Sequence, residues 1–213
     1  MEVMDNSDLI ETQEDILNGL DFLGKVEPKF AEAIRVSGDL PLRRREGGFN
    51  ALLEMILSQQ VSVASANAIS KRLGEAGYKD QNKLAKSTEE NIRACGVSRQ
   101  KARYIHALAN SGLNYEVLHK LPDEEVIKTL TSIPGIGIWT AEIYLMFSMG
   151  KRNVIAAGDL ALQESAKLLF ELPQRPSEKE LREMATKWSP WRSVAARLLW
   201  AYYRVEKSRE GVR

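Results

Sequence analysis

The sequence predicts an all-α protein. Apolar residues recur three and four positions apart along most of the 213-residue chain, which is the period of a helix with one buried face. No stretch alternates apolar and polar residues for long enough to predict a β-strand. Since 44% of the residues are hydrophobic, the chain can bury a substantial core, either as one large domain or as two small lobes that share a cleft.

The first half of the chain contains a long apolar stripe and two shorter helical patterns. The stripe, residues 49–73, predicts one or two long helices. Ser87 and Glu90 have the spacing of a capping box and predict a short helix that stops at Gly96. Another helix, over residues 99–111, is expected to follow at once.

Prolines and glycines set the predicted boundaries in the middle of the chain. Pro122 and Asp123 are expected to open a helix, which must end before Pro134 because a proline forces the preceding residue out of the helical region. After a glycine turn, the next helix is expected over residues 139–149.

The last third of the chain is predicted to contain three helices after a connector. Residues 150–158 form the connector, and residues 160–172 form the first helix. Ser177 and Glu180 have the spacing of a capping box for the second helix, and a final helix is predicted over residues 190–205.

Charge and cysteine content exclude several classes of protein and site. The chain has 30 basic and 29 acidic residues, so any surface that binds a polyanion must be local. Cys95 is the only cysteine, which excludes an intrachain disulfide, a cysteine-ligated zinc site and an iron–sulfur cluster held by four cysteines. The amino terminus has no signal-peptide pattern, and no apolar run approaches the roughly 20 residues of a membrane span. We therefore expect a soluble, intracellular protein.

A tight turn between two predicted helices is the first candidate binding site. Gly135 and Gly137, two residues apart, allow a turn whose backbone N–H groups point outward at the start of the second helix. Such a turn suits a phosphate oxygen, and Thr140 could add a hydroxyl. A pair of glycines in this spacing is also typical of an ordinary turn between helices.

Asp159 is the second candidate. It directly precedes a predicted helix, a position that by itself predicts an N-cap, where the carboxylate accepts from first-turn N–H groups. A carboxylate at the start of a helix can serve as a cap and take part in catalysis at the same time.

Four motifs, in this order, resemble those of the helix-hairpin-helix DNA glycosylases, the HhH-GPD superfamily. They are LSQQVS (57–62), IPGIGIWTA (133–141), GD (158–159) and WSPWRSVAARLLW (188–200). The resemblance extends over about residues 49–200 and is greatest to glycosylases of the 3-methyladenine DNA glycosylase II type.

The resemblance implies one glycosylase domain, residues 1–213, of two helical subdomains with a cleft between them. Residues 1–48 and about 159–213 are expected to form one lobe. Residues of about 49–158 are expected to form the other, with the hairpin at 123–148. Longer relatives carry a β-rich domain ahead of the helices, for which 48 residues leave no space.

The resemblance also assigns roles to individual residues. Asp159 is the expected catalytic carboxylate, and Trp139 and Trp200 are expected to line the base pocket. Gln60 is the expected wedge, the side chain that fills the gap left by the flipped nucleotide. The hairpin, with Gly135, Gly137 and Thr140, is expected to grip DNA without reading its sequence. The backbone carbonyls that would hold a monovalent cation, Na⁺ or K⁺, are those of Thr131, Ile133 and Gly135.

The implied activity is that of a monofunctional DNA glycosylase in base excision repair, an N-glycosidic hydrolase that flips out alkylated purines and leaves an abasic site. Members that also cut the backbone carry a lysine two residues after the second glycine, where this chain has Trp139. The substrates would be 3-methyladenine, and also 7-methylguanine or ethenoadenine. No cofactor is required, and we expect a monomer that acts on double-stranded damaged DNA, in the cytoplasm and nucleoid or in the nucleus.

Three alternatives stay open at this point. They are a bifunctional glycosylase with lyase activity, which Trp139 and the single cysteine disfavour, a glycosylase for another damaged base, and a non-catalytic module that only binds DNA. The prediction of alkylated purines as substrates depends on Trp139 and Trp200, because the electron-rich face of an indole attracts a cationic purine by ~0.5 to 2 kcal/mol. Two other tryptophans, Trp188 and Trp191, are expected to be core residues.

Overall fold

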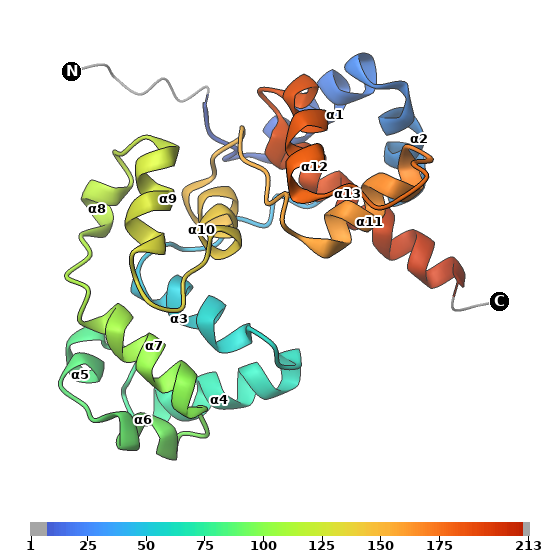
Figure 1. The fold of residues 1–213 in the computed structure, drawn as a ribbon. Coiled ribbons are helices and arrows are strands. Elements are labelled where there is room, and N and C mark those ends of the chain that lie inside the picture. Colours follow the sequence, from blue (N-terminus) through green and yellow to red (C-terminus); the bar gives the residue numbers. More distant parts are fainter. Residues whose placement is uncertain (1–7, 211–213) are drawn as a thin grey trace. The chain divides into compact units, whose positions relative to one another are not determined.

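The computed structural model describes residues 8–210, and the side chains of residues 8–208. The prediction of an all-α protein is confirmed: the described part of the chain has thirteen α-helices and no β-strand beyond an isolated bridge between Leu9 and Lys151. In order (Figure 1), the helices are α1 (Gln13–Val26), α2 (Pro28–Ser37), α3 (Phe49–Ser58), α4 (Val63–Glu75), α5 (Gln81–Ala85), α6 (Glu89–Ala94), α7 (Arg99–Ala109), α8 (Tyr115–Leu118), α9 (Asp123–Thr131), α10 (Ile138–Tyr144), α11 (Leu160–Leu169), α12 (Glu178–Met184) and α13 (Arg192–Glu210).

The chain divides into two compact units. Unit 1 consists of residues 1–44 and 145–213, and unit 2 of residues 45–144. Residues 145–158, which we expected in the lobe of the hairpin, therefore belong to unit 1. Backbone contacts explain the difference: the Ile10 N–H donates to the Gly150 carbonyl at 2.7 Å, and the Ser193 hydroxyl donates to the Lys151 carbonyl at 2.6 Å.

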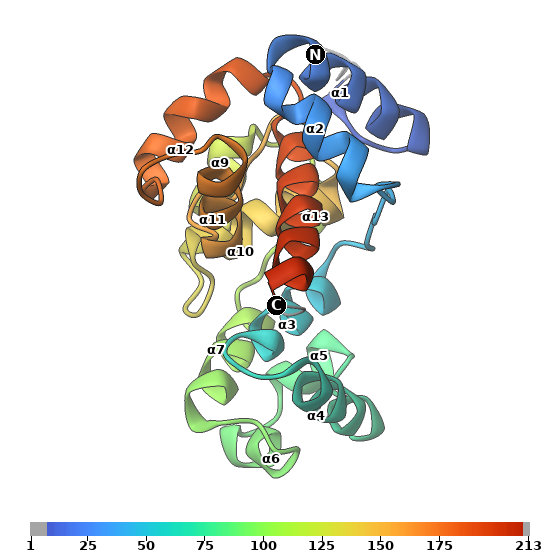
Figure 2. The ribbon, with the colours of Figure 1, turned by 90° about the vertical axis from the view of Figure 1, so that its right-hand side faces the viewer.

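Unit 1 is organised around the long helix α13. Helix α13 contacts α1, α2 and α11, and Figure 2 shows α11 on one side of it and α1 with α2 on the other. Phe30 of α2 packs edge-on against Phe170 and Trp188, with ring centroids 5.6 and 5.2 Å apart. Trp188 is 2% exposed, which confirms its prediction as a core residue, whereas Trp191 is only half-buried beside the Arg152 guanidinium.

Two glycines of α1 test how closely this unit is packed. A Cβ at Gly19 would lie 2.6 Å from Cγ2 of Val194 on α13, whereas a Cβ at Gly24 would meet only Ile34 at 3.7 Å. We expect Gly19→Ala to lower the free energy of unfolding by about 1 to 2 kcal/mol, because overpacking outweighs the gain in helix propensity. The matched control, Gly24→Ala, should raise it by up to ~1 kcal/mol. Chemical denaturation measures both, and equal effects of the two substitutions would contradict the packing seen at Gly19.

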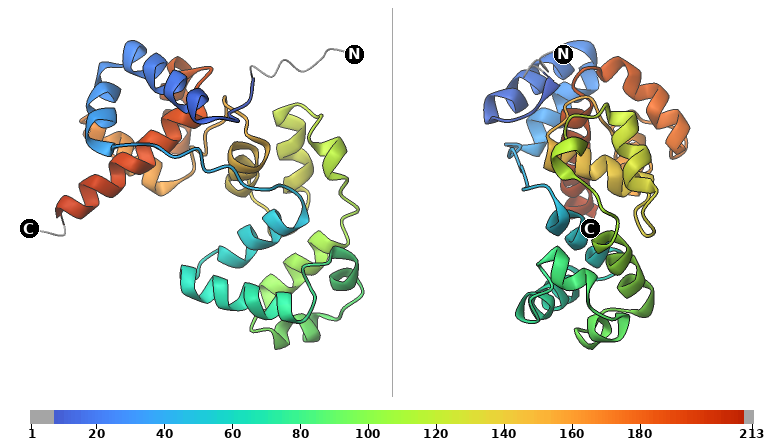
Figure 3. Two further views of the ribbon diagram at one scale, coloured as in Figure 1. Left: turned by 180° about the vertical axis from the view of Figure 1, so that it is seen from behind. Right: turned by 90° about the vertical axis from the view of Figure 1, so that its left-hand side faces the viewer.

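Unit 2 is built on the apolar helix α3. Its fully buried residues include Leu52, Leu53 and Ile56, and it contacts α4, α7 and α10. The shorter helices α5 and α6 pack against α7 (Figure 3).

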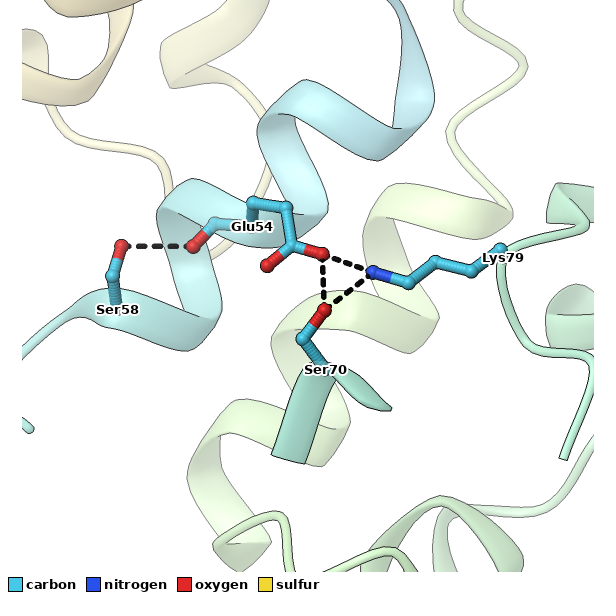
Figure 4. A network of polar contacts seen from close by, with 4 residues as sticks. All are labelled: Glu54, Ser58, Ser70 and Lys79. Atoms are coloured by element: carbon cyan, nitrogen blue, oxygen red, sulfur yellow. Dashed lines mark hydrogen bonds and ion pairs between the residues drawn. The ribbon is translucent and has the colours of Figure 1, made fainter. Parts of the chain in front are cut away.

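A polar network fixes α4 against α3 (Figure 4). The Ser70 hydroxyl of α4 donates to Glu54 of α3 at 2.6 Å, and Lys79, in the loop after α4, donates to Ser70 at 2.8 Å and forms an ion pair with Glu54. The Ser58 hydroxyl donates to the Glu54 carbonyl one turn earlier on α3.

Several predicted helix ends shift by a few residues. Thr88, rather than Ser87, caps α6, because the Ser87 hydroxyl instead donates to the Leu84 carbonyl. The helix after the hairpin changes at residue 145 into a π-helix, Leu145–Met149, and α11 ends at Leu169. The capping box of Ser177 and Glu180 is confirmed at the start of α12.

Candidate functional site

Asp159 caps α11 and bonds to a tryptophan of α13. Its Oδ1 accepts from the Leu162 N–H at 3.0 Å, which confirms the predicted N-cap. The same oxygen accepts from Nε1 of Trp200 at 3.1 Å. The carboxylate is therefore held by two donors from different helices, with the residue half-buried.

The turn before α11 and its contact with α13 explain this arrangement. The Asp159 N–H donates to the Ala156 carbonyl at 2.9 Å, and the buried Gln163 amide donates to the Ala157 carbonyl at 2.9 Å. The Ser165 hydroxyl of α11 donates to the Leu199 carbonyl of α13 at 2.7 Å. Because Leu199 precedes Trp200, this bond brings the indole to the start of α11.

One face of Trp200 is covered by an aromatic residue from the π-helix. The rings of Phe147 and Trp200 lie 5.9 Å apart and are tilted by 30°. The Arg197 guanidinium carbon lies 4.4 Å from the centre of the Phe147 ring. Phe147 lies in the π-helix, and short π-helical turns are frequent at functional sites.

Arg197 is a residue of this cluster that sequence reasoning missed. It is 5% exposed and donates to the carbonyls of Ser193 and Met146, both at 3.1 Å. Burial, with the nearby charges of Arg44 and Arg43, lowers the pKa of Arg197 to about 10, so it stays protonated at neutral pH. The signal was present in the sequence as a lone arginine within the apolar run of the last helix.

A small cavity beside Trp200 is too small for a base. Its volume is about 20 Å³, which is enough for a single water molecule. Its walls come from both ends of unit 1: Leu40, Pro41, Arg43, Phe147, Arg197, Trp200, Ala201 and Arg204.

Unit 2 carries a large groove at the hairpin. Its volume is about 920 Å³. Five of the residues predicted for the site lie in its walls, and Gln59, which was not predicted, lies among them. The five are Gln60, Gly135, Gly137, Trp139 and Thr140.

The two glycines of the hairpin differ in their surroundings. Gly135 has a φ of +91°, and a Cβ there would lie 2.3 Å from Cγ of Tyr104. Gly137 is exposed, and a Cβ there would meet nothing within 4 Å. Gly135 is thus required by the fold, whereas the open side of Gly137 leaves room for an approaching ligand.

The two residues after Gly137 on α10 also differ from each other. Trp139 is 41% exposed, as a residue that receives a ligand should be. Thr140 is only 3% exposed and lies at the floor of the groove, which is not the exposed hydroxyl that we expected. The first turn of α10 packs this side chain inward because its exposed face is taken by Ile138 and Trp139.

Gln60 occupies the short loop between α3 and α4. It is exposed and has a φ of +56°, in the left-handed region that costs a non-glycine residue about 1 to 2 kcal/mol. Strain of this kind persists where the surrounding structure fixes the backbone, and it is common at functional sites.

The carbonyls expected to hold a cation already have protein partners in two of three cases. The Ile133 carbonyl accepts from the Ile136 N–H at 3.1 Å, and the Gly135 carbonyl accepts from Nε2 of Gln59 at 3.0 Å. The Thr131 hydroxyl donates back into α9. Because a carbonyl oxygen has two lone pairs, one hydrogen bond does not fill it, and a monovalent cation at these three carbonyls stays a prediction.

The predicted site residues fall into both units. Asp159 and Trp200 are brought together in unit 1, while Trp139, Gln60 and the hairpin share the groove of unit 2. Within residues 8–210, no cluster of three histidine, cysteine, aspartate or glutamate residues could hold a metal ion. No helix in the same range is long and apolar enough to cross a membrane.

Comparison with protein families gives a match over residues 53–190, to the family described as "HhH-GPD superfamily base excision DNA repair protein". Similar proteins include DNA-3-methyladenine glycosylase 1 of Schizosaccharomyces pombe, which is 29% identical over 90% of this chain and 91% of its own length. The alkylbase DNA glycosidase-like protein mag2 of the same yeast is 26% identical over 84% of this chain and 89% of its own. DNA-3-methyladenine glycosylase 2 of Escherichia coli is 26% identical over 71% of this chain but only 56% of its own length.

Solved structures show the same fold. The chain is similar to a DNA-3-methyladenine glycosidase from Bacillus halodurans, with a TM-score of 0.80 and 29% identity over 89% of this chain and 91% of that one. It is also similar to the S. pombe 3-methyladenine DNA glycosylase in complex with abasic DNA, with a TM-score of 0.76 and 26% identity over 86% of this chain and 95% of that one.

Proposed function

The chain belongs to the HhH-GPD superfamily of base excision repair DNA glycosylases, and we propose that it is a monofunctional member that releases alkylated purines from double-stranded DNA. The observation that carries this proposal is the Asp159 carboxylate, held at the start of α11 by the indole N–H of Trp200. It joins the expected catalytic group to an expected base-binding group in one hydrogen bond.

Asp159 would act on the sugar of the flipped nucleotide. Breaking the N-glycosidic bond builds positive charge on the sugar, and a fixed carboxylate nearby stabilises that charge. The same carboxylate can orient or deprotonate the attacking water. The two N–H donors at its Oδ1 keep it in place, so little reorganisation is needed during the reaction.

The proposed substrates need little help from a general acid. A 3-methyl or 7-methyl purine is already cationic and leaves without further protonation. Trp139 and Trp200 would contact this base, since the electron-rich face of an indole attracts a cation. The half-exposed Trp139 side chain supports this role in unit 2.

Hydrolysis without strand cleavage is the proposed outcome, because Trp139 stands where a lyase would need an amine. An amine is required for the Schiff base that leads to backbone cleavage. Trp139 and Gly137 both line the groove of unit 2, and the amine of Lys101, which lines the same groove, donates to the Leu57 carbonyl at 2.6 Å. An abasic site is therefore the expected product.

The hairpin and the wedge would hold the DNA. The N–H groups at the exposed Gly137 suit a backbone phosphate, and the exposed Gln60 would fill the gap left by the flipped nucleotide. The relatives named for 3-methyladenine support the substrate class.

Incubation of the protein with methylated duplex DNA, followed by chromatography of the released bases, tests the proposal. We expect free 3-methyladenine, and abasic sites that stay uncleaved until alkali is added. Tight DNA binding without any released base would overturn the proposal in favour of a binding module. Strand breaks without alkali would overturn its monofunctional part.

A further inference from the structure

The loop between α3 and α4 has hydrogen bonds on both sides of an exposed, strained residue. Helix α3 ends at Ser58 and α4 is capped by Ser62, so only three residues join the helices. Gln60, at the centre, is exposed with a φ of +56°. A left-handed glutamine at the surface relaxes unless its neighbours fix the backbone on both sides.

Gln59 connects this loop to the hairpin. Its Nε2 donates to the Gly135 carbonyl at 3.0 Å, across 76 residues of sequence. The acceptor is itself fixed, because Gly135 is pressed against the Tyr104 ring with a φ of +91°. The hydrogen bond therefore joins the residue before Gln60 to a hairpin residue whose backbone is held by its neighbours.

Lys101 holds the other side of the loop. Its ammonium donates to the Leu57 carbonyl at 2.6 Å, in the last turn of α3. A cation is favourable there because the carbonyls at the end of a helix lack backbone donors. The Leu57 side chain is fully buried, so this bond ties the loop to the core of unit 2.

We propose that Gln59 is a positioning residue that couples the hairpin to the wedge, so that docking of the hairpin on a phosphate sets the depth at which Gln60 enters the duplex. This inference rests on the proposed function for the identity of the wedge. The Gly135 carbonyl, to which Gln59 donates, is one of the three oxygens that the family resemblance assigns to a cation.

Base unstacking by variants of Gln59 tests the proposal without relying on catalysis. Gln59→Met keeps the length of the side chain but has no donor. The matched control is Gln81→Met, which removes another amide-to-carbonyl bond of unit 2, the one from Gln81 Nε2 to the Ala109 carbonyl at 3.1 Å. The readouts are the fluorescence of 2-aminopurine next to an abasic-site analogue in a duplex, the affinity for that duplex, and thermal stability.

We expect Gln59→Met to reduce the fluorescence increase on binding about five- to tenfold, which corresponds to the loss of one hydrogen bond. The affinity for the duplex should change less than about twofold. Gln81→Met should lower the thermal stability about as much as Gln59→Met does, but it should leave the fluorescence increase unchanged. A full fluorescence response from Gln59→Met, or equal losses from both variants, would overturn the proposal.

Excision kinetics separate the two proposals. Gln59→Met should slow release of 3-methyladenine from a fully paired duplex more than from a single-base bulge, in which the base has no pairing partner and costs less to extrude. Equal slowing on both substrates would count against a positioning role. If the wild type releases no base at all, the proposed function fails, while the fluorescence comparison still decides the role of Gln59.

Discussion

Replacing Asp159 by asparagine is expected to reduce the single-turnover rate of base release by at least about a thousandfold while leaving the fold intact. Asparagine is as good an N-cap as aspartate, and its carbonyl oxygen can still accept from Leu162 N–H and from Trp200 Nε1. Only the negative charge is lost. The effect on rate therefore isolates the electrostatic role of the carboxylate from its structural role.

Single-turnover excision on methylated duplex DNA, with binding to abasic-site DNA and thermal unfolding in parallel, measures this prediction. The comparison variant is Asp159→Ala, which should lose the activity and also about 1 kcal/mol of stability, because α11 loses its cap. A rate for Asp159→Asn within about tenfold of the wild type would show that another group carries the reaction.

Helix ends could be predicted from the sequence where they depend only on residues a few positions apart. The capping box of Ser177 and Glu180 depends on residues three apart, and the start of α9 depends on Pro122 and Asp123. Thr88 shows the limit of such signals. It follows Ser87, both can cap a helix, and the choice depends on a contact of Ser87 with the preceding helix.

Contacts between distant residues could not be predicted in the same way. The bond from Trp200 to Asp159 spans 41 residues and depends on how α11 packs on α13. The family resemblance indicated both residues but not that they bond to each other. The π-helix that places Phe147 beside Trp200 has no local pattern either, because its residues continue the apolar periodicity of α10.

Gln59 and the boundary of unit 1 show why the rest was missed. Sequence reasoning selected Gln60 because a wedge was expected, while the role of Gln59 depends on a carbonyl 76 residues away. Residues 145–158 follow the hairpin directly in sequence, so they were assigned to its lobe. Their backbone partners, Ile10 and Ser193, come from both ends of the chain.

Gly135 and Gly137 look equivalent in the motif IPGIGIWTA, yet we expect their alanine variants to fail in opposite ways. Gly135→Ala should lower the free energy of unfolding by about 3 kcal/mol, because alanine is strained at a positive φ and its Cβ would clash with the Tyr104 ring. Turning the ring does not relieve the clash, because the added Cβ would also lie 2.6 Å from Cβ of Tyr104, which is fixed to the backbone of α7. Chemical denaturation measures this loss.

Gly137→Ala is the matched control for that variant. Its Cβ would meet open space, so stability should change by less than about 0.5 kcal/mol. Its affinity for duplex DNA should nevertheless fall, because the added methyl group occupies the place where a phosphate approaches the hairpin. If Gly137→Ala bound DNA as tightly as the wild type, the hairpin would be a structural turn only, and the groove beside Trp139 would have to bind DNA by other contacts.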